Sequence, residues 1–248
     1  MTTDTMIRRA LLVLCLLIAP LGLIAIELFH PANFTTHPGM YQFLSHAEHD
    51  EANFKAIAYF GPDWWFILHM VQTPLVGLVA IGLWMLVDMA HVSDDWIALV
   101  LRWLARVAIF VFLIYYTVLD GIGGIGLGRT ILTVQRLQSD GTLTPQQVDG
   151  VALVLNRVWT DPWVGGVGSF VSKTGSWAAF ASAVFVAGAL RRARVAGWLT
   201  VVALLAFGWE LQTSHASPHG PAAFLLLIIA SCALWWRHRG RPTVAVSY

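Results

Sequence analysis

Residues 99–126 read LVLRWLARVAIFVFLIYYTVLDGIGGIG, and the fold class follows from this stretch. No charged residue lies between Arg106 and Asp120. A helix needs about 20 apolar residues to cross the hydrocarbon core of a bilayer, and this segment is long enough. A chain in lipid must also satisfy its own backbone hydrogen bonds, which a helix does. The sequence therefore predicts a membrane-spanning helix here.

Five further apolar stretches surround this segment in the chain. They cover approximately residues 9–28, 64–87, 170–190, 196–211 and 221–236. The composition agrees, because only 12% of the residues are charged, against about 25% in soluble domains. We therefore predict an all-α, polytopic membrane helix bundle with about six transmembrane helices, formed by residues 1–248 as a single domain.

The positions of the arginines predict the orientation of the bundle. Cytoplasmic loops are enriched in Lys and Arg. Arginines precede the first span, follow the start of the third, link the fourth to the fifth and follow the sixth: Arg8, Arg9, Arg102, Arg106, Arg191, Arg192, Arg194, Arg237, Arg239 and Arg241. With six spans, all of these are cytoplasmic when both termini are. Because Ala, Leu, Val and Arg are frequent, we expect a bacterial inner (plasma) membrane.

The long segment between the third and fourth predicted spans, residues 128–169, is expected on the outer side and carries a helix-start signal. Thr144-Pro145-Gln146-Gln147 combines an N-cap, a proline in the first turn and a glutamine three residues after the cap. Apolar residues at helical spacing follow, from Val148 to Trp159. We predict an amphipathic helix on the outer surface of the membrane.

Ionisable residues gather near the outer ends of the spans. Glu27 ends the first span and His30 follows it, His69 lies in the second span, and Asp120 lies in the third. Glu210 closes the fifth span, and His215 and His219 connect it to the sixth. Ionisable groups at membrane depth are costly and are therefore candidates for function.

Imidazole and carboxylate are the usual protein ligands of zinc, copper and iron. We therefore predict a metal or haem site near the outer face, with zinc, copper or haem as the candidate cofactors. The predicted ligands are His30, His69, His215 and His219, and the predicted acid, base or orienting groups are Glu27, Asp120 and Glu210.

Each of these residues also has a purely structural interpretation. His30 shares an outer loop with His37, His46 and His49, and loop histidines are commonly solvated. His69 could simply bond a neighbouring helix, and Asp120 could pair with Arg129.

The last two histidines have the i, i+4 spacing of a shared helix face. Pro218 and Pro221 instead favour a helix that is capped by Ser217 and begins close to His219.

The glycines that follow Asp120 do not predict a nucleotide-binding loop. Such a loop needs a preceding strand, whereas this run continues a membrane span. Small side chains at Gly121, Gly124 and Gly128 are instead expected to let another helix approach closely.

The second predicted span carries His69 and the third carries Asp120. A His-x-x-x-His pair, His215 and His219, precedes the last span. This inventory resembles that of membrane zinc hydrolases of the alkaline ceramidase and adiponectin-receptor type. The chain departs from that pattern by its six predicted spans instead of seven, by Trp65 in place of a serine, and by Pro218 within the histidine pair. We use the resemblance as an analogy.

The sequence is compatible with three classes of function. The first is a membrane-embedded hydrolase or oxidoreductase that acts on a lipid-soluble substrate. The second is a proton-coupled transporter, and the third is a non-catalytic accessory or binding subunit. The expected partners are the lipid bilayer, a lipophilic small molecule or other membrane subunits. A net charge of +1 without a basic stripe argues against nucleic acid.

Overall fold

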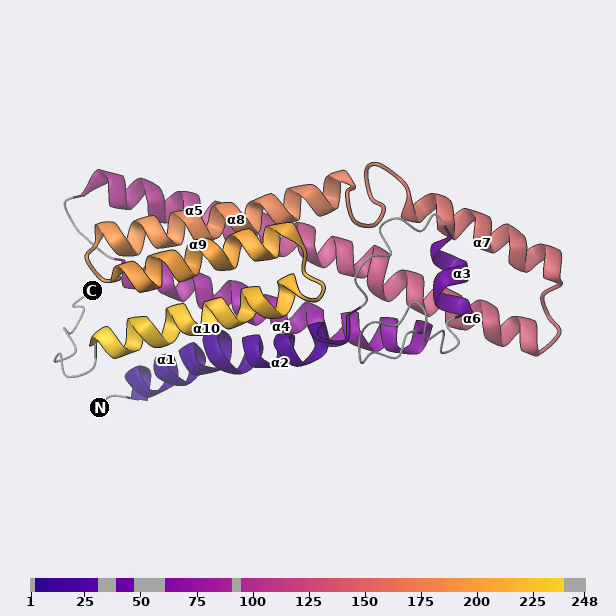
Figure 1. Cartoon of the computed structure of the whole chain (residues 1–248), viewed down its shortest axis with the longest axis horizontal. Helices are drawn as coiled ribbons and strands as arrows, with labels where there is room; N and C mark the ends of the chain where they lie inside the picture. The colour runs from indigo at the N-terminus through magenta and orange to yellow at the C-terminus, as the bar shows by residue number, and fades with distance from the viewer. Residues whose placement is uncertain (1–2, 31–38, 47–60, 91–94, 239–248) are drawn as a thin grey trace.

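The computed structural model describes residues 3–30, 39–46, 61–90 and 95–238, and all regular secondary structure in these ranges is helical. The predicted helix bundle is therefore confirmed (Figure 1). The elements are α1 (Thr3–Val13), η1 (Leu14–Ile18), α2 (Ala19–Glu27), α3 (Met40–Ser45), α4 (Pro62–Met89), α5 (Trp96–Leu119), η3 (Asp120–Gly126), α6 (Leu127–Ser139), α7 (Pro145–Trp159), α8 (Phe170–Arg192), α9 (Trp198–Thr213) and α10 (His219–His238).

Among the described residues, five helices are long and apolar enough to cross a membrane. They are Thr3–Glu27, Pro62–Met89, Trp96–Ser139, Phe170–Arg192 and His219–His238. The fifth predicted span, residues 196–211, corresponds to α9, which has 16 residues and is the shortest of the bundle helices. At 1.5 Å per residue it covers about 24 Å, less than a typical hydrocarbon core of about 30 Å.

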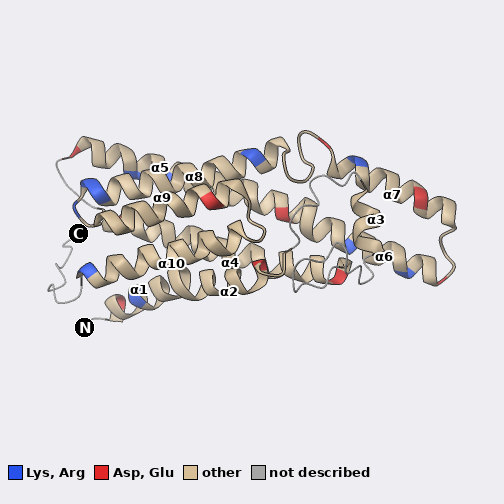
Figure 2. Cartoon of the chain, viewed as in Figure 1, with Lys and Arg blue, Asp and Glu red and all other residues tan. Residues whose placement is uncertain are grey.

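The six helical segments run in alternating directions along the long axis of the molecule. Figure 1 shows that α1 begins and α10 ends at the same end of the bundle. Basic residues lie at this end on α1, α8 and α10 (Figure 2). The arrangement is what an even number of crossings produces.

Small side chains let the central helices pack closely. The buried face of α8 includes Gly175, Ala179, Ala183 and Ala187. A Cβ added to Gly208 on α9 would lie only 2.6 Å from the Cβ of Ala183. Close approach of backbones through small residues is the usual way in which helices associate in lipid.

The third span continues far beyond the predicted end at Gly126. The segments α5, η3 and α6 form one helix, Trp96–Ser139, because the glycine run adopts π-helical geometry without ending the helix. The outer part, α6, extends past the bundle, and α7 returns beside it (Figure 1).

The predicted helix start at Thr144 is confirmed. The Thr144 side chain accepts from the backbone N–H of Gln147, and the Gln147 side chain accepts from that of Thr144, which is a capping box. The helix α7 packs on α6 and on the short α3 and runs along the long axis of the bundle (Figure 1). A second, smaller hydrophobic core holds these elements together around Met40, Ile131 and Ala152.

Candidate metal centre

His69 lies in the second turn of α4, about 10 Å from the start of that helix. Its side chain is only 3% exposed, and its Nδ1–H donates to the carbonyl oxygen of Trp65 at 2.7 Å. A carbonyl can only accept, so the proton is on Nδ1 and the Nε2 lone pair is available to a ligand.

The ring of His69 lies directly against the backbone of Gly124 in η3. A Cβ at position 124 would come within 2.2 Å of Cγ and Cδ2 of that ring, so only glycine fits. The next residue towards the amino terminus contributes too, because the carbonyl oxygen of Gly123 accepts from Nε1 of Trp65 at 2.9 Å. Segment η3 thus holds both the histidine and the tryptophan that orients it.

His30 follows α2 in a turn that α4 fixes in place. The Nε1–H of Trp64 donates to the carbonyl oxygen of Phe29 at 3.0 Å, and the backbone N–H of His30 donates to that of Glu27 at 3.1 Å. The His30 side chain is only 3% exposed.

The interpretation of His30 as a solvated loop residue is therefore wrong, whereas His46 is exposed as expected. His37 and His49 lie outside the described residues.

His215 lies in the turn between α9 and α10. Burial lowers the pKa of this imidazole to about 4, so it is neutral at pH 7. The turn packs tightly on α10, because a Cβ at Gly220 would lie 1.7 Å from the carbonyl oxygen of His215. The ring is flanked by Tyr116, with 5.7 Å between the ring centroids.

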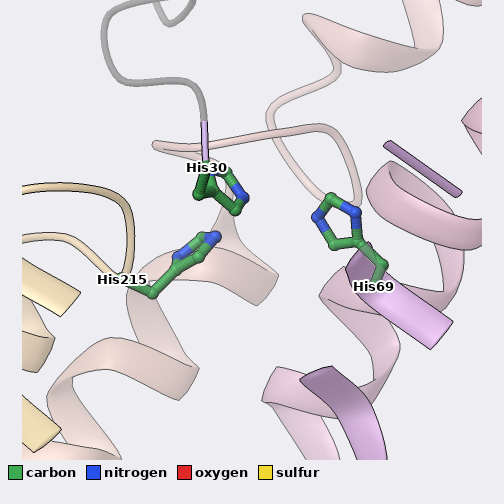
Figure 3. Close-up of side chains that lie close together, drawn as sticks. All are labelled: His30, His69 and His215. Carbon is green, nitrogen blue, oxygen red and sulfur yellow. The ribbon is translucent and has the colours of Figure 1, made fainter. Parts of the chain in front are cut away.

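The three histidines converge from α2, α4 and the α9–α10 turn. One ligand nitrogen of each can be chosen so that all three lie within 4.8 Å of one another. The ring centroids of His30 are 5.4 Å from His69 and 4.9 Å from His215. Figure 3 shows the rings facing a shared space. Tetrahedral zinc holds its nitrogens about 3.3 Å apart, so binding would draw the rings together by at most about 1.5 Å.

Two of the predicted carboxyl groups lie one helical turn deeper than the histidines. Glu27 precedes His30 by three residues and Asp120 precedes Gly124 by four, and both are buried. The hydroxyl oxygen of Thr73 lies 3.1 Å from Oδ2 of Asp120 and 2.9 Å from the carbonyl oxygen of His69. Asp120 is therefore tied to α4 by Thr73, while Arg129 lies over the ring of Phe66.

The other two predicted residues form a separate pair. Nδ1 of His219 lies 2.7 Å from Oε2 of Glu210, and the two side chains are 40% and 30% exposed. Helix α10 begins at His219, so His215 precedes the helix and does not share a helical face with it. The structure thus divides the predicted set into two groups. Four members of the first are buried and His215 is partly exposed, while Glu210 and His219 form a half-exposed pair.

A cavity adjoins the cluster. Its wall includes Trp65, His69, Asp120, Gly124, Trp159 and His215. On the other side of His215, a second cavity lies between α5 and α8, with Tyr116, Ser172 and Gly175 in its wall. Trp65 and Tyr116 were not predicted as site residues, because an aromatic residue in an apolar span has no sequence signal that separates a site wall from lipid-facing packing. Trp159 was not predicted either, because it ends α7, which lies outside the predicted spans.

No protein-family model matches the chain, and no curated protein or solved structure matches it significantly.

Proposed function

We propose that this protein is a membrane-embedded metalloprotein in which His30, His69 and His215 bind one divalent transition-metal ion, zinc or copper. The observation that supports this is the convergence of the three imidazoles within 4.8 Å. The His69–Trp65 bond adds support, because metal-binding histidines usually donate their second ring N–H to a backbone carbonyl or carboxylate. Three imidazoles around one point suit a bare ion better than a haem, which takes axial ligands on opposite faces.

The proposed chemistry is hydrolysis, with zinc as the preferred ion. Three histidines leave one coordination position open, and zinc in such a site lowers the pKa of bound water to about 7. Asp120 lines the same cavity as His69 and His215, so it is a candidate to accept the proton. The cavity between α5 and α8 also reaches His215. We propose a lipid-soluble ester or amide as substrate because the site lies among helices that are apolar enough to span a membrane.

We further propose that both termini are cytoplasmic and that the membrane is a bacterial inner membrane. The basic end of the bundle, where α1 begins and α10 ends, would then face the cytoplasm. The metal centre would lie just beneath the opposite, outer headgroups.

Metal analysis of the purified protein tests the proposed site. We expect about one zinc ion per chain after dialysis against zinc, and loss of that ion in His69→Ala and in His215→Ala. The matched control is His219→Ala, since His219 pairs with Glu210 outside the cluster and its loss should leave the occupancy unchanged. Full occupancy in His69→Ala, or emptying by His219→Ala, would contradict the proposed ligand set.

A further inference from the structure

Beneath the imidazoles lies a group of buried oxygen atoms that we call the oxygen layer: Glu27, Gln72 and Asp120. Both carboxyl oxygens of Glu27, Oε1 of Gln72 and Oδ1 of Asp120 are buried and have no hydrogen-bond partner within the part of the chain that the structure describes. The amide nitrogen of Gln72 donates to the hydroxyl of Tyr116. Buried polar atoms are nearly always paired, so these oxygens require an explanation.

Helical spacing places the oxygen layer about one turn, or 5 Å, below the three histidines. Glu27 lies three residues before His30, and Gln72 lies three residues after His69 on a helix of opposite direction. The carboxyl groups of Glu27 and Asp120 are close enough to interact electrostatically. The layer thus contains two interacting carboxyl groups beside the centre.

When all three imidazoles are neutral, the charges of the two layers balance in two states. Three neutral imidazoles with a divalent ion carry a charge of +2, and an uncompensated buried charge is very costly. Two carboxylates supply −2. Without the ion, the same two carboxylates would be buried and unpaired, and they are neutral only when each holds a proton. Two carboxylic acids also supply two O–H donors for the remaining acceptors of Glu27 and Gln72.

On the basis of the proposed metal site, we infer that the protein exchanges one divalent ion for two protons at this centre. Binding forms three metal–nitrogen bonds at His30, His69 and His215 and breaks the O–H bonds of the Glu27 and Asp120 carboxyl groups. The two protons leave to solvent. The net charge of the buried centre is zero before and after, so the carboxylates act as the counter-charge of the ion and not as its ligands.

Calorimetric titration of zinc into the metal-free protein in detergent, in two buffers of different ionisation enthalpy, counts the released protons. The titration is made at pH 6, where a zinc-bound water with a pKa of about 7 keeps its proton and does not add to the count. We expect about two protons per zinc in the wild type and about one in Glu27→Gln and in Asp120→Asn. These isosteric variants should bind zinc about 10–100-fold more weakly, the usual effect of losing a group that surrounds the ligands. The control Glu210→Gln should keep two protons and the wild-type affinity, because Glu210 pairs with His219 instead.

The outcomes separate the two proposals. If the wild type binds zinc through His69 without releasing protons, or if the double variant Glu27→Gln/Asp120→Asn still releases two, the exchange is wrong and the metal site stands. If the wild type binds no zinc, the metal site itself is wrong. The wild-type proton count decides the exchange even if a variant fails to fold.

Discussion

At the scale of single residues, the centre depends on a glycine with no chemistry of its own. Gly124 leaves room for the His69 ring, which a Cβ would meet at 2.2 Å. Overpacking of this kind costs about 1–3 kcal/mol or displaces the side chain. We therefore expect Gly124→Ala to lower both the melting temperature and the zinc affinity, measured by thermal unfolding and metal analysis.

The neighbouring Gly121 provides the matched control. It lies in the same segment η3, and a Cβ there would meet no atom within 4 Å. Alanine is a better helix former than glycine by about 1 kcal/mol, so Gly121→Ala should keep the metal and unfold at the same or a higher temperature. Equal zinc affinity in both variants would show that the contact between Gly124 and His69 does not position the ring.

The candidate site residues that lie within the spans could be predicted from the sequence. His69, Asp120 and Glu27 were identified as candidates because charged and polar groups are rare in such stretches. Burial of His30 depends on how Trp64 of α4 holds the turn after α2, a contact between segments distant in sequence that leaves no local pattern. The pairing of Glu210 with His219 depends on how the turn between α9 and α10 brings the two helix ends together.

At the scale of elements, the start of α7 offers a prediction that is independent of the metal centre. Thr144→Ala removes the capping box and should cost about 1 kcal/mol of local stability. Hydrogen exchange of the backbone amides in the first turn of α7 should become faster, while zinc binding stays unchanged. Thr142→Ala, an exposed threonine in the same turn, should leave those exchange rates as they are. Faster exchange in both variants would mean that the cap contributes nothing specific.

The ends of helices were predicted correctly where neighbouring residues in the sequence determine them. The predicted ends were wrong where packing against other helices determines them. The threonine–proline signal predicted the start of α7 correctly. The glycine run was taken as the end of the third span, yet the helix continues to Ser139. Close packing against Trp65, Phe66 and His69 replaces the side-chain contacts that glycines lack, so the run remains helical.

At the scale of the whole molecule, the number of crossings can be tested directly. In a variant without Cys15 and Cys232, single cysteines would replace Thr142, in the turn between α6 and α7, and Arg194, in the turn between α8 and α9. A membrane-impermeant thiol reagent added to intact cells should label position 142 and spare position 194, since the two sites lie at opposite ends of the bundle.

Labelling of both positions, or of position 194 alone, would contradict the proposed orientation. The same experiment tests whether α9, with 16 residues, crosses the bilayer. A cysteine in place of Thr213, at the end of α9, should react from outside only if it does.

The bundle itself was the most predictable feature, because apolar length needs no knowledge of contacts. The small hydrophobic core of α3, α6 and α7 was not predicted. Residues of this core such as Met40 and Ile131 lie outside the predicted spans, and only the assembly of the three helices shows which apolar side chains are buried.

The helix Trp96–Ser139 runs unbroken from the bundle into the hairpin that α6 and α7 form. The outer end of this helix projects from the bundle and its inner end packs against α8. Segment η3 lies between the two ends, beside His69. Both parts of this helix rest on α4, because Gly124 of η3 packs on the ring of His69 and Gly128 of α6 packs on Phe66. A shift of the hairpin relative to α4 would therefore also change the packing around His69.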